Sequence, residues 1–123
     1  MANSTPFLTV AQNQDNTFRV LTLDYQAPVY ASTIALVCPK YKTFVHVGTL
    51  TGALSISIDV TNTFGIGAEL TLDFVADSGG THVVTFGTGF ASPGTLSVLA
   101  SKYGKASFTY NGTVWVGSGT ATA

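Results

Sequence analysis

Two carboxylates in the second half of the chain have a spacing that invites comparison with acid–base catalysis. Glu69 and Asp73 lie four residues apart in a segment of strand-like composition, which places both on one strand face. A strand rises about 3.3 Å per residue, so the two backbones are about 13 Å apart, whereas paired carboxylates in glycoside hydrolases lie about 5 to 9.5 Å apart. Convergence of Asp59, Asp73 and Asp77 stays open, but Asp77 begins an Asp-Ser-Gly-Gly run that is typical of a turn.

The two histidines and the single cysteine lack the spacing of a metal or nucleophile site. His46 lies inside a Phe-Val-His-Val run and His82 follows a Gly-Gly pair, and neither has a second ligand at the short intervals of zinc sites. Cys38 ends an apolar run, which favours a buried structural thiol over a reactive one. No Gly-x-Ser-x-Gly motif marks a nucleophilic serine. We therefore expect no catalytic residue, no metal ligand and no cofactor.

Two glycine pairs are similar to phosphate-binding loops in composition only. They are the runs Gly65-Ile66-Gly67 and Gly87-Thr88-Gly89. A phosphate loop works by leading into a helix whose N-terminus faces the anion, and no helical pattern follows either run. Both are better interpreted as tight turns between strands.

Aromatic residues concentrate in the C-terminal half, where they suggest either a sugar-stacking platform or a core with a subunit interface. The residues concerned are Phe86, Phe90, Tyr103, Phe108, Tyr110 and Trp115. The second interpretation is favoured, because Phe108 and Tyr110 share one face of an alternating segment and are placed to pair across a hairpin. Phe86, Phe90 and Trp115 are accordingly predicted to contribute to an assembly interface.

The elements that must position these residues are short strands separated by Pro and Gly. Nine are expected, at residues 17–24, 29–38, 41–49, 53–60, 69–76, 81–86, 95–99, 105–110 and 113–116. The clearest alternation places Leu54, Ile56 and Ile58 on one face. Between the last two strands, Asn111-Gly112 predicts a two-residue type I′ turn. The pattern predicts an all-β fold, namely an antiparallel β-sandwich, a jelly roll or a small barrel.

The chain divides into an arm, one domain and a tail. Its 123 residues suit a single β domain, which we expect over residues 17–117. Residues 1–16 are polar apart from Phe7 and Leu8 and predict an extended arm that docks on a neighbouring subunit through those two side chains. Residues 118–123 are small and predict a short C-terminal tail.

The scarcity of charge is the strongest compositional signal. Charged residues make up 9% of the chain, against about a quarter in typical soluble domains. Free monomers normally carry interspersed charges that maintain solubility and protect strand edges. Low charge therefore predicts a surface buried against other subunits, although a Thr-rich monomer that tolerates low charge is the alternative.

Composition also argues against several kinds of partner. The net charge is −1 and the five basic residues are scattered, so no positive stripe is available to neutralise a nucleic-acid backbone. No apolar stretch approaches the roughly 20 residues that span a bilayer, and the first residues lack the order of a signal peptide. We expect neither nucleic acid nor membrane as a partner.

Residues 58–117 carry a set of motifs that resembles the β domain of tailed-phage head fibres, capsid decoration proteins and tail fibres. The motifs are Gly67-x-Glu69-Leu70, Phe74-x-Ala76-Asp77, Val84-Thr85-Phe86-Gly87-Thr88-Gly89-Phe90, Gly94-Thr95-Leu96 and Phe108-x-Tyr110-Asn111-Gly112-Thr113-x-Trp115. The resemblance covers about half of the chain. It implies a trimeric or otherwise multimeric structural protein of the virion, not an enzyme, with no catalytic residue to carry over.

Chain length favours one role among these. A fibre needs an anchor, a shaft and a tip, which 123 residues in one domain scarcely provide. We therefore expect a capsid decoration or auxiliary protein, made in the cytoplasm of an infected bacterium, that binds the major capsid protein on the outer capsid and stabilises the head. The alternatives are a head-fibre or tail-fibre module that binds host-surface glycans, tested by Trp115→Ala, and a collar or tail protein.

Overall fold

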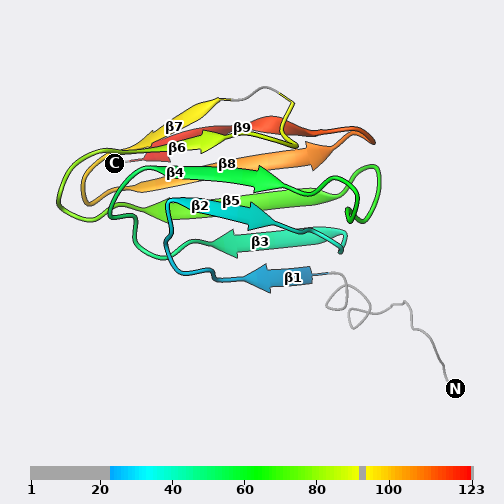
Figure 1. Ribbon diagram of the computed structural model, residues 1–123, viewed down its shortest axis with the longest axis horizontal. Coiled ribbons are helices and arrows are strands. Elements are labelled where there is room, and N and C mark those ends of the chain that lie inside the picture. The colour runs from blue at the N-terminus through cyan, green and yellow to red at the C-terminus, as the bar shows by residue number, and fades with distance from the viewer. Residues whose placement is uncertain (1–22, 92–93, 123) are drawn as a thin grey trace, which may run out of the picture.

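The computed structural model describes residues 23–91 and 94–122, and only the backbone of residues 118–122 (Figure 1). Within these ranges the chain forms nine strands and no helix. The strands are β1 (Leu23–Gln26), β2 (Thr33–Leu36), β3 (Lys42–His46), β4 (Leu54–Ile58), β5 (Glu69–Val75), β6 (His82–Phe86), β7 (Thr95–Val98), β8 (Tyr103–Tyr110) and β9 (Trp115–Thr122). They form a first sheet in the order β1-β3-β5-β8-β9 and a second sheet in the order β2-β4-β6-β7.

The first six strands wind as a coil between the two sheets. Odd-numbered strands join the first sheet and even-numbered strands the second, and each pairs in parallel with the strand two places earlier. Parallel neighbours need a long crossover connection, which is usually a helix. Here the strand in the opposite sheet serves as that connection, so a parallel arrangement arises without any helix.

Antiparallel pairing completes both sheets. β7 pairs with β6 in the second sheet, while β8 pairs with both β5 and β9 in the first. The expected hairpin at Asn111 joins β8 to β9, but its turn is not type I′. The Asn111 side chain accepts hydrogen bonds from the backbone N–H groups of Thr113 and Val114, and Gly112 alone in this loop has a positive φ, of 102°. A type I′ turn needs positive φ at both central positions.

The all-β prediction and its nine strands are confirmed, and the antiparallel description is wrong. Each sheet contains two parallel pairs of strands beside its antiparallel pairing, so the fold is a pair of mixed sheets, neither a closed barrel nor a jelly roll. Residues 118–122, expected as a tail, continue β9 along β8. The predicted arm at residues 1–16, with Phe7 and Leu8, lies outside the described residues.

One hydrophobic core lies between the sheets. Its aromatic rings meet across the interface: Phe86 of the second sheet contacts Phe74 and Phe108 of the first, with ring centroids 6.4 and 5.1 Å apart. The expected inward face of β4 is confirmed, because Leu54, Ile56 and Ile58 are all buried. Strands β3 to β8 alternate more buried with more exposed residues, so each sheet keeps one outer face open to solvent or to a partner.

Candidate functional site

The aromatic residues predicted for an assembly interface lie inside the protein. Phe86, Phe90 and Trp115 are buried, and Phe86 contacts Phe90 with ring centroids 5.4 Å apart. Phe108 and Tyr110 are buried as well, which agrees with the favoured core interpretation. These side chains therefore offer no surface to a second subunit, and any interface must be made by outward-facing residues.

Trp115 is the largest fully buried side chain among the described residues. Its exposed fraction is 0%, and its ring packs against Tyr110 at a centroid distance of 5.4 Å. Its indole Nε1 has no hydrogen-bond partner in the described part of the chain. A residue in this position cannot stack on a sugar, so Trp115→Ala tests the stability of the core and not glycan binding.

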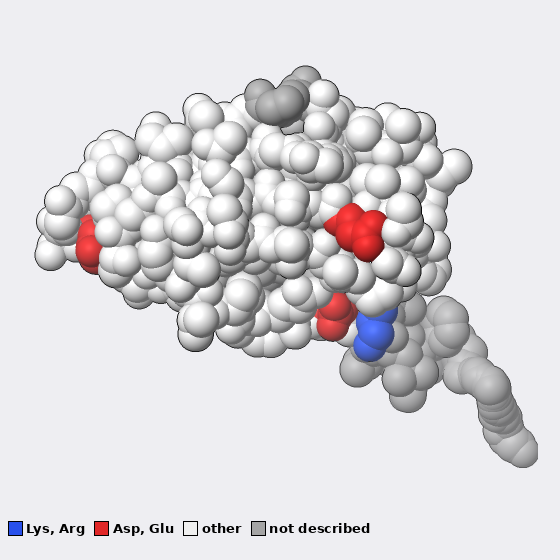
Figure 2. All heavy atoms as spheres, viewed as in Figure 1, with Lys and Arg blue, Asp and Glu red and all other residues white. Residues whose placement is uncertain are grey.

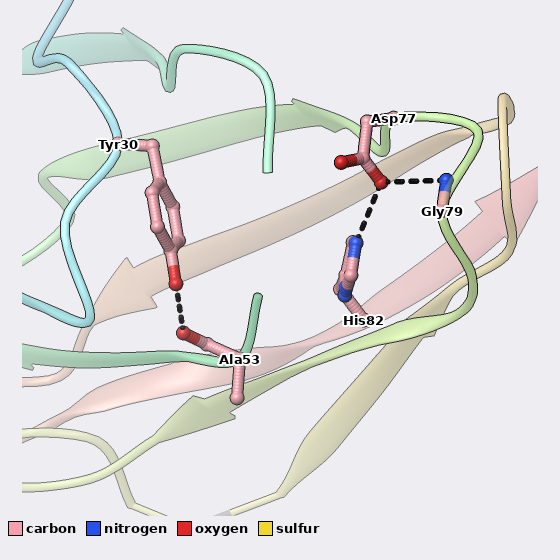
Figure 3. A network of polar contacts seen from close by, with 5 residues as sticks. All are labelled: Tyr30, Ala53, Asp77, Gly79 and His82. Carbon is pink, nitrogen blue, oxygen red and sulfur yellow. Dashed lines mark hydrogen bonds and ion pairs between the residues drawn. The ribbon is translucent and has the colours of Figure 1, made fainter. Parts of the chain in front are cut away.

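Cys38 and Asp77 occupy the places predicted for them. Cys38 is fully buried, and burial raises the pKa of its thiol to about 11, which suits a structural role. Asp77 caps its own turn by accepting a hydrogen bond from the Gly79 backbone N–H at 3.0 Å. Figure 3 shows that the same carboxylate oxygen also contacts His82 Nε2, at 2.8 Å. The histidine contact was not predicted, because it depends on how the loop folds back onto β6.

The Asp77 contacts make stability depend on pH. The hydrogen bond from His82 is the main cause that lowers the pKa of Asp77 from its usual 3.8, and the hydrogen bond from the Gly79 backbone N–H is the second. A lowered pKa means that the stabilisation is complete above 3.8 and is lost as the pH falls through the folded-state pKa. We expect the difference in free energy of unfolding between wild type and Asp77→Asn to shrink as the pH falls below 3.8. Urea unfolding from neutral pH to about pH 2 measures this difference. A difference that stays constant over this range would contradict the role of the charge.

The described acidic residues do not gather into a catalytic or metal site. Asp59 accepts hydrogen bonds within its own turn from Thr61, whereas Asp73 contacts His46 Nδ1 and Asp77 contacts His82. In residues 23–91 and 94–122, no group of three His, Cys, Asp or Glu side chains is placed to hold a metal ion. Neither histidine has a serine hydroxyl as a hydrogen-bond partner in the same ranges. The arrangement therefore contains histidine–aspartate pairs without a nucleophile.

The outer face of the first sheet carries charges in the middle of the sheet. Lys42 of β3 and Glu69 of β5 are direct neighbours, with Nζ and Oε1 3.7 Å apart. Four residues further along the same face, His46 lies opposite Asp73, and Asp73 lies opposite Lys105 of β8. These pairs join segments more than twenty residues apart, so only the strand pairing brings them together.

The strand residues on the outer face of the second sheet carry no charge, and the exposed carboxylate of Asp59 follows directly after the end of β4. Its outward residues on the four strands are Thr33, Ala35, Ser55, Ser57, Val83, Thr85, Thr95 and Ser97. One row across the sheet consists entirely of hydroxyl side chains, Thr33 beside Ser55, Ser55 beside Thr85 and Thr85 beside Thr95. Figure 2 shows a face whose broad middle is white, with charged atoms only toward its ends and one margin. Low charge is thus concentrated on one face of the protein.

Comparison with known proteins does not assign the chain to a family. No family profile matches it, and no curated protein matches it by sequence. A helix able to cross a membrane is not found among residues 23–91 and 94–122. The geometry of the two outer faces is therefore the main structural guide to function.

Proposed function

We propose that this chain is a structural, non-catalytic protein of a phage particle, a decoration or auxiliary protein that packs with copies of itself on the outer capsid. The observation that carries the proposal is the uncharged outer face of the second sheet. It is built from small hydroxyl and apolar side chains on β2, β4, β6 and β7.

Small uncharged side chains suit burial against another protein. Hydroxyl groups can exchange water for partner groups at modest cost, whereas an unpaired lysine or carboxylate loses several kcal/mol when an interface excludes water. Interface cores are accordingly depleted of charged residues. The first sheet offers a contrast within the same protein, because its outer face retains Lys42, Glu69, Asp73 and Lys105. A general tolerance of low charge would not place charged residues on the strands of one face and none on the strands of the other.

The virion assignment draws on the resemblance of residues 58–117, which include strands β5 to β8 and the start of β9. The partners proposed are further copies, with a trimer as the expected state, and the major capsid protein. Each contact of a small domain is weak, but many equivalent contacts around a closed lattice raise the effective concentration for every further contact. Binding of this kind stabilises a head against the pressure of packaged DNA.

A lysine in the middle of the uncharged face tests the proposal. Ser55 is exposed, and its neighbours across the sheet are Thr33 and Thr85. We expect Ser55→Lys to raise the dissociation constant for self-association or capsid binding at least about tenfold, because the ammonium group must be desolvated. Sedimentation equilibrium measures the first quantity, and co-sedimentation with capsids lacking the protein measures the second.

Ser107→Lys is the matched control, since Ser107 is an exposed strand serine on the outer face of the first sheet. It adds the same charge and should leave assembly and capsid binding unchanged. Equal behaviour of the two variants, or a wild-type chain that stays monomeric and does not bind capsids, would refute the proposal.

A further inference from the structure

The outer face of the first sheet combines an aromatic surface with a polar hollow. Adjacent strands place Tyr25 beside Phe44, Phe44 beside Thr71, and Thr71 beside Ser107. Neighbouring strands are about 4.8 Å apart, so this row runs without interruption for about 14 Å across β1, β3, β5 and β8. Tyr25 and Phe44 are far apart in the sequence, and only the parallel pairing of β1 with β3 makes them neighbours.

The aromatic end of the row is accessible at Tyr25, whose ring stacks on that of Phe44. The rings of Tyr25 and Phe44 are nearly parallel, with centroids 5.9 Å apart and an interplanar angle of 14°, and Tyr25 is 60% exposed. Exposed aromatic side chains provide a large and rigid contact area at low cost in conformational entropy. Such a surface suits a ligand with a flat apolar side, as the C–H face of a sugar ring has.

The other end of the row opens into a hollow of about 320 Å³ between β5, β8 and β9. Hydroxyl groups from Thr71, Ser107 and Thr109 line it, together with the carboxylate of Glu69 and the apolar side chain of Val116. Hydroxyls both donate and accept hydrogen bonds, and a carboxylate accepts two or more. This lining matches a ligand that is itself rich in hydroxyl groups.

The charges around the row favour a ligand without net charge. Two lysines, Lys42 and Lys105, balance two acids, Glu69 and Asp73, so the formal charge of the face is zero with His46 counted as neutral. The acids are also directly paired, Glu69 with Lys42 and Asp73 with His46. A polyanion or polycation would gain little attraction from such a face.

We propose that this face binds a neutral sugar chain, with one ring stacked on Tyr25 and its neighbours hydrogen-bonded in the hollow. This site lies on the sheet opposite to the proposed assembly face, so a capsid-bound copy can present it outward. The inference goes beyond the structural role and does not depend on it.

Titration of the full chain with cellohexaose, chitohexaose and maltohexaose, followed by amide NMR, tests the site. We expect at least one of these neutral probes to shift the amide signals of Thr71, Ser107 and Thr109, and oligogalacturonate to bind more weakly. Tyr25→Ala should weaken binding about tenfold through loss of ring stacking. Ser107→Lys should weaken it as well, by filling the hollow.

Phe64→Ala is the matched control, because Phe64 is an aromatic residue of similar exposure, 58%, in the loop before β5. Its binding should equal that of the wild type. Failure of all the neutral probes at millimolar concentration, equal losses in Tyr25→Ala and Phe64→Ala, or shifts confined to the second sheet would overturn the site. Ser55→Lys separates the two proposals, since it should impair assembly and leave sugar binding intact.

Discussion

Trp115→Ala is expected to lower the free energy of unfolding by about 3–5 kcal/mol, the usual cost of removing a large buried aromatic side chain. Trp115 is fully buried at the start of β9. Its backbone also forms hydrogen bonds with Gly89 and Ala91, which lie in the loop between β6 and β7 of the second sheet. The indole thus fills the core where the last hairpin meets the second sheet. Trp115 is the only tryptophan of the chain, so the substitution also removes the tryptophan fluorescence signal. Unfolding in urea should therefore be followed by far-UV circular dichroism.

Trp115→Phe separates packing from hydrogen bonding. Phenylalanine keeps most of the ring and removes the Nε1 donor, which has no partner among the described residues. Since an unsatisfied buried donor is itself costly, we expect a loss of at most about 2 kcal/mol. Both variants are compared with wild type at one protein concentration, because self-association adds to apparent stability. An alanine variant as stable as the phenylalanine variant would contradict the packing role of Trp115.

Gly89→Ala is expected to destabilise the fold by about 3 kcal/mol, from backbone strain and steric overlap together. Gly89 has a φ of 94°, and a Cβ atom there would lie 2.3 Å from the Ile58 carbonyl oxygen. That oxygen belongs to the end of β4, so relief requires the backbone to move. The same measurement by urea unfolding applies.

Gly67→Ala separates backbone strain from steric overlap, because it retains the strain alone. Gly67 has nearly the same φ, 91°, but nothing lies within 4 Å of a Cβ atom built on it. Only backbone strain remains, which costs about 1 kcal/mol. Equal losses in the two variants would show that the contact with Ile58 does not constrain the fold.

The two outer faces differ in their chemistry, and each suits one of the two partners that we propose. The strands of the second sheet present a row of hydroxyl groups and no charged side chain on their outer face. The outer face of the first sheet presents paired ions, an aromatic pair and a hollow. A particle protein with one face for its own copies and another for a sugar would join the assembly role to the adhesion role that the sequence left as alternatives.

The sequence by itself indicated an all-β chain of nine strands and, for residues 53–60 and 69–76, which side chains point inward. Alternation with a period of two marks a half-buried strand, so Ile56 and Leu72 could be assigned to the core without a structure. The turn at Asp77 was equally readable, because an aspartate followed by glycines bonds its own backbone. These features are local, because they arise from interactions between residues that are close together in the sequence.

Only the tertiary structure decided which strands become neighbours. The period of two is the same for parallel and antiparallel partners, so the pattern could not reveal the coil of β1 to β6. The pairs Tyr25 with Phe44 and His46 with Asp73 follow from that coil, as does the separation of a charged face from an uncharged one. The composition shows that the chain has few charged residues. Their distribution between the two outer faces depends on long-range strand pairing, which no short segment of the sequence encodes.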